Sequence, residues 1–89
     1  MDIEELASLH KAMSVKTRLK ILTLLSDRPM CLNAITRFMD ISQPSVSQHL
    51  SILRRAGMVT TKKEGYRVHY SINRARLEEF RRTLNSFPG

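Results

Sequence analysis

The 89-residue sequence is short of the residues that mark several protein classes: it has one cysteine, no tryptophan, three glycines and three prolines. The single cysteine, Cys31, excludes a disulfide within the chain. No segment approaches the roughly 20 consecutive apolar residues of a membrane-spanning helix. The acidic, amphipathic start, MDIEELASLHK, also lacks the positive leader and apolar run of a signal peptide. We therefore expect a cytoplasmic protein that has no membrane partner.

Motifs of catalysis and metal binding are missing as well. The sequence has no glycine-rich phosphate loop, no pair of carboxylates that suggests a catalytic pocket, and no clear Cys-His or Ser-His partnership. The three histidines, His10, His49 and His69, do not have the spacing of metal ligands. These absences indicate a protein that is not an enzyme and that carries neither a cofactor nor a metal.

Acidic residues are scarce in the second half of the chain. Residues 1–40 contain six Lys or Arg and five Asp or Glu, whereas residues 41–89 contain nine and three. The second half therefore carries six of the seven surplus positive charges. Such a bias is expected of a surface that faces a polyanion, although a basic surface that serves only solubility would have the same charge.

Length and composition predict one folded domain, residues 1–89. Hydrophobic residues make up 42% of the chain, as in ordinary folded domains. A domain of this size buries only roughly 60 to 65% of the surface of its unfolded chain. We therefore expect a thin core that a partner chain would help to complete.

Hydrophobic spacing predicts two helices before residue 28. The first covers about residues 2–13, with Asp2 as a candidate N-cap. The second lies in VKTRLKILTLLSD and should end near Asp27, because Pro29 disfavours helical geometry in the residue before it. Its apolar residues share one broad face, so we expect this helix to be the central buried one: Val15, Leu19, Ile21, Leu22, Leu24 and Leu25.

A helix-turn-helix is predicted over about residues 31–56. Its first helix is short, from roughly Cys31 to Met39, and a tight turn follows at Asp40 and Ile41. Ser42 is a good N-cap for the second helix, whose first turn tolerates Pro44. The residues expected to be buried in the short helix are Leu32, Ile35 and either Phe38 or Met39.

After Gly57 the pattern changes to that of β-structure and then returns to that of a helix. The segment MVTTKKEGYRVHYSI has β-branched and aromatic residues on both sides of Glu64-Gly65, which predicts a hairpin over about residues 59–72. Cations flank its tip: Lys62, Lys63 and Arg67. A last helix, about residues 74–87, has a narrow apolar seam: Leu77, Phe80, Leu84 and Phe87.

The helix that begins after Ser42 is unusually polar. On a helical wheel, Val46, Leu50 and Leu53 fall within roughly 60° of one another. Gln48, Ser51 and Arg55 point the opposite way, and Ser47 lies beside them. One face would anchor the helix to the core, and the other would offer short polar groups and a cation. A helix that enters a DNA major groove, about 12 Å wide, needs an outer face of this kind.

The order of the elements and three stretches of sequence resemble the ArsR/SmtB family of winged helix-turn-helix repressors. The stretches are MSVKTRLKILTLL, ISQPSVSQHLSILRRAGMV and KKEGYRVHYSI, and the resemblance covers about Leu9 to Leu84. The most specific matches are Ser42, Gln43, Ser47, His49, Leu50, Leu53, Arg54, Ala56 and Gly57. The resemblance implies a mainly α fold with a small β-hairpin wing (α+β). Its order would be four helices, the hairpin and a fifth helix, and the terminal helices would form a homodimer.

The resemblance also implies a function, that of a dimeric repressor bound to double-stranded operator DNA. The fourth helix would contact the major groove and the wing would contact the backbone or minor groove. Carried over by position, the DNA-binding residues would be Ser42, Gln43, Ser45, Ser47, Gln48, His49, Arg54, Lys62, Lys63 and Arg67. The dimer interface would consist of Ile3, Leu6, Met13, Leu77, Phe80 and Leu84. We disfavour the alternative, that both terminal seams fold back on their own core, because the second helix would already supply that core.

The sequence departs from the family at its metal sites. Cys31 stands where the family has the first cysteine of a Cys-Val-Cys motif, but Asn33 replaces the second. The positions that match a second family site hold Arg74, Arg76 and Phe87 instead of ligands. One thiol is fewer than arsenite or zinc requires, so we expect no metal, and the effector is unknown.

Cys31 has two interpretations, a small buried apolar residue or the thiol of a redox-responsive regulator. Two other classes of function also compete with operator binding. One is a winged-helix module that binds proteins and not DNA. The other is an RNA-binding protein, which an aromatic content of 6% disfavours, since RNA readers stack bases on exposed aromatic rings.

Overall fold

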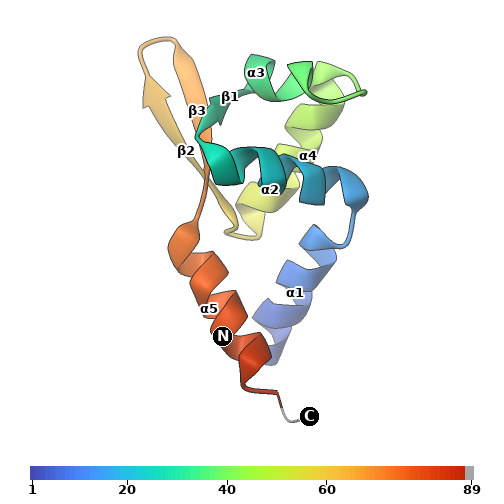
Figure 1. The fold of residues 1–89 in the computed structure, drawn as a ribbon, viewed down its shortest axis with the longest axis vertical. Helices are drawn as coiled ribbons and strands as arrows, with labels where there is room; N and C mark the ends of the chain where they lie inside the picture. Colours follow the sequence, from blue (N-terminus) through green and yellow to red (C-terminus); the bar gives the residue numbers. More distant parts are fainter. Residues whose placement is uncertain (88–89) are drawn as a thin grey trace.

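The computed structural model describes residues 1–87, in which five helices lie beside and below a small antiparallel sheet whose hairpin projects from one edge of the fold (Figure 1). The fold is the predicted winged helix-turn-helix, with the hairpin as the wing and a C-terminal helix after it. Its elements are α1 (Ile3–Met13), α2 (Lys16–Asp27), β1 (Met30–Cys31), α3 (Leu32–Arg37), α4 (Gln43–Arg55), β2 (Val59–Glu64), β3 (Arg67–Ile72) and α5 (Arg74–Asn85). Among the described residues no helix has the length and apolar character needed to cross a membrane.

Side-chain caps mark the start of α1 and of α5. The Asp2 carboxylate accepts a hydrogen bond from the Glu5 amide at 2.8 Å, as predicted for the start of α1. Asn73 caps α5 by accepting from the Arg76 amide at 3.1 Å, and its side-chain amide donates to the Gly57 carbonyl at 3.0 Å. Asn73 therefore ties the start of α5 to the chain reversal that follows α4.

The sheet contains one strand that sequence periodicity did not predict. β1 pairs with β3 in the order β1-β3-β2, with Met30 opposite Tyr70 and Cys31 opposite His69. Cys31 was expected in the first turn of α3, but it is the N-cap residue, and Leu32 is the first helical residue. The short helix is also shorter than predicted, ending at Arg37, and Phe38 is 53% exposed.

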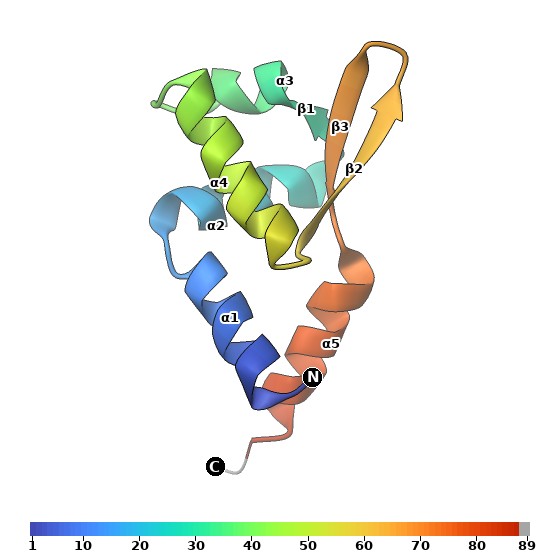
Figure 2. The same ribbon diagram turned by 180° about the vertical axis from the view of Figure 1, so that it is seen from behind.

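The core lies between α2, α4 and the base of the sheet, and α1 and α5 extend from it as two arms (Figures 1 and 2). Ile21, Leu22 and Leu25 bury the inner face of α2 as predicted, but Leu19 is 47% exposed. The expectation that α2 supplies the core by itself was wrong. Residues of both terminal arms belong to the core as well: Leu6, Leu9 and Phe80.

Candidate nucleic-acid interface

Helix α4 is fixed by its N-cap and by one apolar face. The Ser42 hydroxyl accepts a hydrogen bond from the Ser45 amide at 3.3 Å, and Pro44 lies in the first turn, where backbone donors have no helical partner. Val46, Leu50 and Leu53 are all 0% exposed. Burying three such side chains along one face sets the rotation of the helix about its axis.

The opposite face of α4 is open to solvent. Gln48, Ser51 and Arg55 are exposed, as the helical wheel predicted, and Ser47 and Arg54 beside them are also exposed. No acidic residue occurs between Ile41 and Lys63. The outer face of α4 and the first half of the wing therefore present hydroxyl, amide and cationic groups without a nearby carboxylate on the same stretch of chain.

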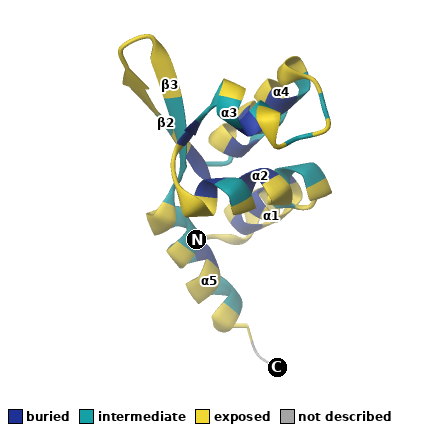
Figure 3. Ribbon diagram, turned by 45° about the horizontal axis from the view of Figure 1, so that its top comes forward, coloured by how far each residue is buried: buried dark blue, intermediate teal, exposed yellow. Residues whose placement is uncertain are grey.

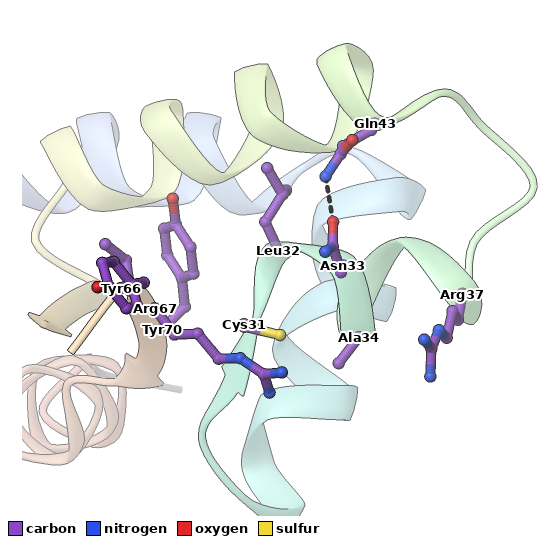
Figure 4. A pocket seen from close by; sticks show the side chains of 10 residues that line it. Cys31, Leu32, Asn33, Ala34, Arg37, Gln43, Tyr66, Arg67 and Tyr70 are labelled. Carbon is purple, nitrogen blue, oxygen red and sulfur yellow. Dashed lines mark hydrogen bonds between the residues drawn. The ribbon is translucent and has the colours of Figure 1, made fainter. Parts of the chain in front are cut away.

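The N-terminal end of α4 is held by the helix before it. The side-chain amide of Gln43 donates a hydrogen bond to the side-chain oxygen of Asn33 on α3, and both residues are exposed (Figure 4). The Ser42 and Ser45 hydroxyls are 3.2 Å apart and hydrogen-bonded. The sequence did not predict this contact between Gln43 and Asn33, since a contact between residues ten apart leaves no periodic signal.

His49, which the resemblance assigns to DNA contact, also makes a contact within the chain. It is half-buried, and its Nδ1 accepts a hydrogen bond from Arg18 Nε on α2 at 3.3 Å. Arg18 also donates from Nη1 to the Ala12 carbonyl at 2.9 Å. His49 therefore joins α4, through Arg18, to the junction of α1 and α2.

The wing is a β-hairpin with a two-residue loop, and the residues at its tip are exposed (Figure 3). Its register pairs Glu64 with Arg67, so the loop is Gly65-Tyr66. Gly65 has φ +62°, a left-handed conformation in which a side chain is strained, and this glycine is what the tight loop requires. Tyr66 is fully exposed beside it.

The three predicted cations of the wing do not share one face. Cross-strand partners lie on the same side of a sheet, and the pairing places Lys62 with His69 and Glu64 with Arg67. Lys63 pairs with Val68 and lies on the opposite side. The Lys62 ammonium is 3.8 Å from the Glu64 carboxylate, an exposed ion pair of little strength. Lys62 and Arg67 thus occupy one face of the wing and Lys63 the other.

A hollow of about 450 Å³ separates the wing from α3 and the start of α4 (Figure 4). Cys31 borders it and is half-buried, as a free thiol. Gln43 and Arg67, two residues assigned to DNA contact, also line this hollow, together with Arg37 and Tyr66. Arg37 was not predicted as a site residue from the sequence, because a single exposed side chain produces no pattern.

The terminal arms contact each other within one chain. The rings of His10 and Phe80 lie 5.1 Å apart in an edge-on arrangement. Arg76 Nη1 donates to Glu5 Oε2 on α1 and to Glu79 Oε1 on α5, each at 3.1 Å. The hydrogen bond with Glu5, and then that with Glu79, raise the pKa of Arg76 above its ordinary value against the opposing effect of desolvation.

The residues assigned to a dimer interface fall into three groups by burial. Leu6 and Phe80 are buried within the chain, at 7% and 8% exposure, whereas Ile3 is 83% exposed. The remaining three, Met13, Leu77 and Leu84, are half-buried. Arg74 and Arg76, at positions that hold ligands in metal-binding members, are engaged elsewhere: Arg74 donates to the Ser26 carbonyl at 2.9 Å. Within residues 1–87 no three His, Cys, Asp or Glu side chains are grouped as metal ligands.

Comparison with known proteins identifies the family of this fold. The family model of bacterial regulatory proteins of the arsR family matches residues 16–61. The arsenical resistance operon repressor of Staphylococcus aureus is 35% identical over 85 residues, covering 96% of this chain and 82% of the repressor. The transcriptional activator HlyU of Vibrio cholerae is 40% identical over 65 residues, covering 73% of this chain and 60% of the activator.

A solved structure agrees with the fold over nearly the whole chain. The homodimeric winged helix-turn-helix DNA-binding domain of Mb0332 from Mycobacterium bovis, a possible ArsR-family regulator, superposes with a TM-score of 0.78 at 28% identity. The match covers 93% of this chain and 80% of that domain. The anchored polar helix, the wing and these matches together show that the chain belongs to the arsR family of DNA-binding transcriptional regulators.

Proposed function

We propose that the protein binds operator DNA sequence-specifically as a homodimer and represses transcription without a metal. In this proposal the N-terminal half of α4 enters a major groove and the wing lies against the flanking backbone. The observation that carries it is the split of α4 into two faces. Val46, Leu50 and Leu53 are 0% exposed, and Gln48, Ser51 and Arg55 face solvent.

Within this proposal the side chains have separate roles. Gln43, Ser45, Ser47 and Gln48 contact base edges, since amides and hydroxyls pair with the donors and acceptors of the major groove. Arg54, Lys62, Lys63 and Arg67 contact phosphates, which fix register without carrying sequence information. Because Lys62 and Arg67 share one face of the wing, they would contact the same strand of backbone, and Lys63 would contribute less.

Two supports bear on assembly and on the sign of regulation. The Mycobacterium bovis relative is homodimeric, and α1 and α5 leave apolar surface for a partner at Ile3, Leu77 and Leu84. A two-fold axis through these arms would set two α4 helices about one DNA turn, roughly 34 Å, apart. The Staphylococcus relative is a repressor and the Vibrio relative an activator, so a promoter-fusion assay decides the sign for this chain.

The test is fluorescence anisotropy against the promoter of the protein's own gene and against unrelated DNA, with salt varied. Gln48→Ala should weaken operator binding by roughly 1 to 3 kcal/mol and leave unrelated DNA nearly unchanged. Arg67→Ala should weaken both about equally and lower the salt dependence by about one unit. Lys20→Ala, an exposed cation on α2, is the matched control and should alter neither.

Equal behaviour of Gln48→Ala and Arg67→Ala would refute this assignment of roles. Sedimentation at micromolar concentration tests the dimer separately. A monomeric mass with full operator affinity would count against a homodimer.

The position of Cys31 favours a second candidate function, regulation by thiol chemistry. Its half-buried thiol borders the hollow that Gln43 and Arg67 also line, so a bulky modification there would obstruct the space between α4 and the wing. If so, a thiol-specific oxidant should release DNA from the wild type and leave Cys31→Ser bound. Release that is the same in both proteins would remove this candidate.

A further inference from the structure

A second hollow, of about 540 Å³, lies where the end of α1, the start of α2 and the end of α4 meet. Three of the residues that line it are cationic: Lys11, Arg18 and Arg55. The rest are small, hydroxylated or apolar, and none is acidic. Within residues 1–87 none of the three cations takes part in an ion pair. Three like charges thus border one hollow without a counter-charge, an arrangement that an anion would stabilise.

One of these cations is held in place before any ligand arrives. Arg18 is half-buried and donates from Nε to His49 and from Nη1 to the Ala12 carbonyl. These two bonds fix the plane of the guanidinium at the edge of the hollow. A fixed guanidinium suits the oxygens of phosphate better than a flexible ammonium does, because less conformational freedom is lost on binding.

Arg55 connects the hollow to the outer face of α4. It lies on the same exposed stripe as Gln48 and Ser51, one turn beyond Ser51. The hydrogen bond between Arg18 and His49 makes a second connection to the same helix, at 3.3 Å. An anion in the hollow would therefore contact side chains of α4 and of the α1–α2 junction at once.

We propose that this junction hollow is a phosphate-binding site formed by Lys11, Arg18 and Arg55. Two guanidinium groups and one ammonium match a phosphate group, and Ser8 adds a hydroxyl donor to the lining. The volume falls within the range of small-molecule sites, about 300 to 1,000 Å³. The phosphate has two possible sources, the backbone of bound DNA and a free phosphorylated molecule. The site itself does not depend on the proposed role of α4 in base recognition.

The site is tested first without DNA. Inorganic phosphate is titrated into the full chain at pH 7 and constant ionic strength, with chloride as the balancing anion, and amide chemical shifts are followed by NMR. Saturable shifts are expected around Lys11, Arg18 and Arg55. Lys11→Gln and Arg55→Gln should each weaken the phosphate affinity roughly tenfold or more, since each removes a charge-assisted hydrogen bond. Lys20→Gln, whose cation lies outside the hollow, should leave it unchanged.

The same variants distinguish the two sources of phosphate. If the DNA backbone occupies the hollow, phosphate competes with operator DNA, and Lys11→Gln and Arg55→Gln each lower the salt dependence by about one unit. If a small molecule occupies it, phosphate and DNA bind together and Lys11→Gln leaves DNA affinity unchanged. If no shifts appear, phosphate does not bind, and if the shifts are equal in wild type and all variants, phosphate is an adventitious ion only. Either result would overturn the proposal. The proposed base recognition is tested separately, by the operator affinity of Gln48→Ala, so a failure of that proposal can be distinguished from a failure of the phosphate site.

Discussion

The contact between the two terminal arms predicts that Arg76→Ala destabilises the protein by about 0.4 to 2 kcal/mol. Arg76 bonds Glu5 and Glu79 at 3.1 Å each, with the guanidinium side chain 22% exposed and the carboxylates 46% and 40% exposed. Exposed pairs contribute roughly 0.2 to 1 kcal/mol each, so two pairs of intermediate exposure give about 0.4 to 2. The pairs supply most of the expected effect.

Two further contributions of Arg76 nearly offset each other. Truncation to alanine removes two methylenes that are largely buried, worth up to about 1.2 kcal/mol after correction for their exposure. It also removes the buried Nε, which has no hydrogen-bond partner in the structure and whose burial costs about 1 kcal/mol. The net change is therefore close to that of the ion pairs.

The assay is urea unfolding followed by circular dichroism at 50 mM and 500 mM NaCl, at one fixed protein concentration because dimerisation would make stability concentration-dependent. The destabilisation should shrink at high salt. Arg81→Ala is the matched control, since the Arg81 and Glu78 side chains, 3.6 Å apart, are 64% and 54% exposed, and it should cost less than about 0.5 kcal/mol. Because the carboxylates raise the pKa of Arg76, its contribution to stability is present around neutrality and is lost as pH rises through that raised value.

A double-mutant cycle with Glu5→Gln isolates the contact between α1 and α5. The coupling energy should be positive and roughly 0.5 to 1 kcal/mol. If Arg76→Ala were no more destabilising than Arg81→Ala, or if the cycle gave no coupling, the contact would not hold the arms together. Either result would refute the reasoning.

Two other substitutions test the parts of the site separately. Leu50→Ala removes a fully buried anchor of α4 and should cost about 2 to 5 kcal/mol in urea unfolding, whereas Ser51→Ala on the exposed face should change stability by less than about 0.5. Gly65→Ala places a side chain at φ +62° with no atom within 4 Å, so strain alone should lower stability by about 1 to 2 kcal/mol. Unchanged stability of Gly65→Ala would contradict the strain argument.

The sequence predicted the features of the fold that repeat locally. Val46, Leu50 and Leu53 recur at helical spacing, and each is buried on the predicted face. Ser42 and Asp2 cap the helices they were expected to cap, since an N-cap acts on its own first turn. Periodicity and capping depend on residues that are close in the chain, so both can be predicted from a single sequence.

The features that the sequence did not predict depend on contacts between distant residues. β1 is only two residues long, too short for any alternation, and exists because Met30 and Cys31 pair with β3. Arg18 and His49, 31 positions apart, are hydrogen-bonded, and Arg76 reaches Glu5 from 71 positions away. None of these pairs produces a pattern in the sequence, although each positions part of the candidate site.

Leu19 shows why hydrophobic spacing overestimates a core. It follows the stripe of α2 and yet is 47% exposed, on the rim of an apolar hollow that Leu22, Ile72 and Leu77 also line. Helical spacing identifies a face that is apolar, but burial depends on what packs over that face. In a thin domain, one chain can leave part of such a face uncovered.

The same distinction applies to the terminal arms, where it changes how a dimer seam should be assigned. Leu6 and Phe80 have the spacing of interface residues, but packing within the chain has already removed their surface from water. Only area that is still exposed in one chain can be buried by a second, so the energy of association has to come from residues such as Ile3 and the half-buried Leu77 and Leu84. Arg76 joins the same arms through Glu5 and its side chain lies beside Gly57, which follows α4, so the contact between the arms and the end of α4 share one side chain.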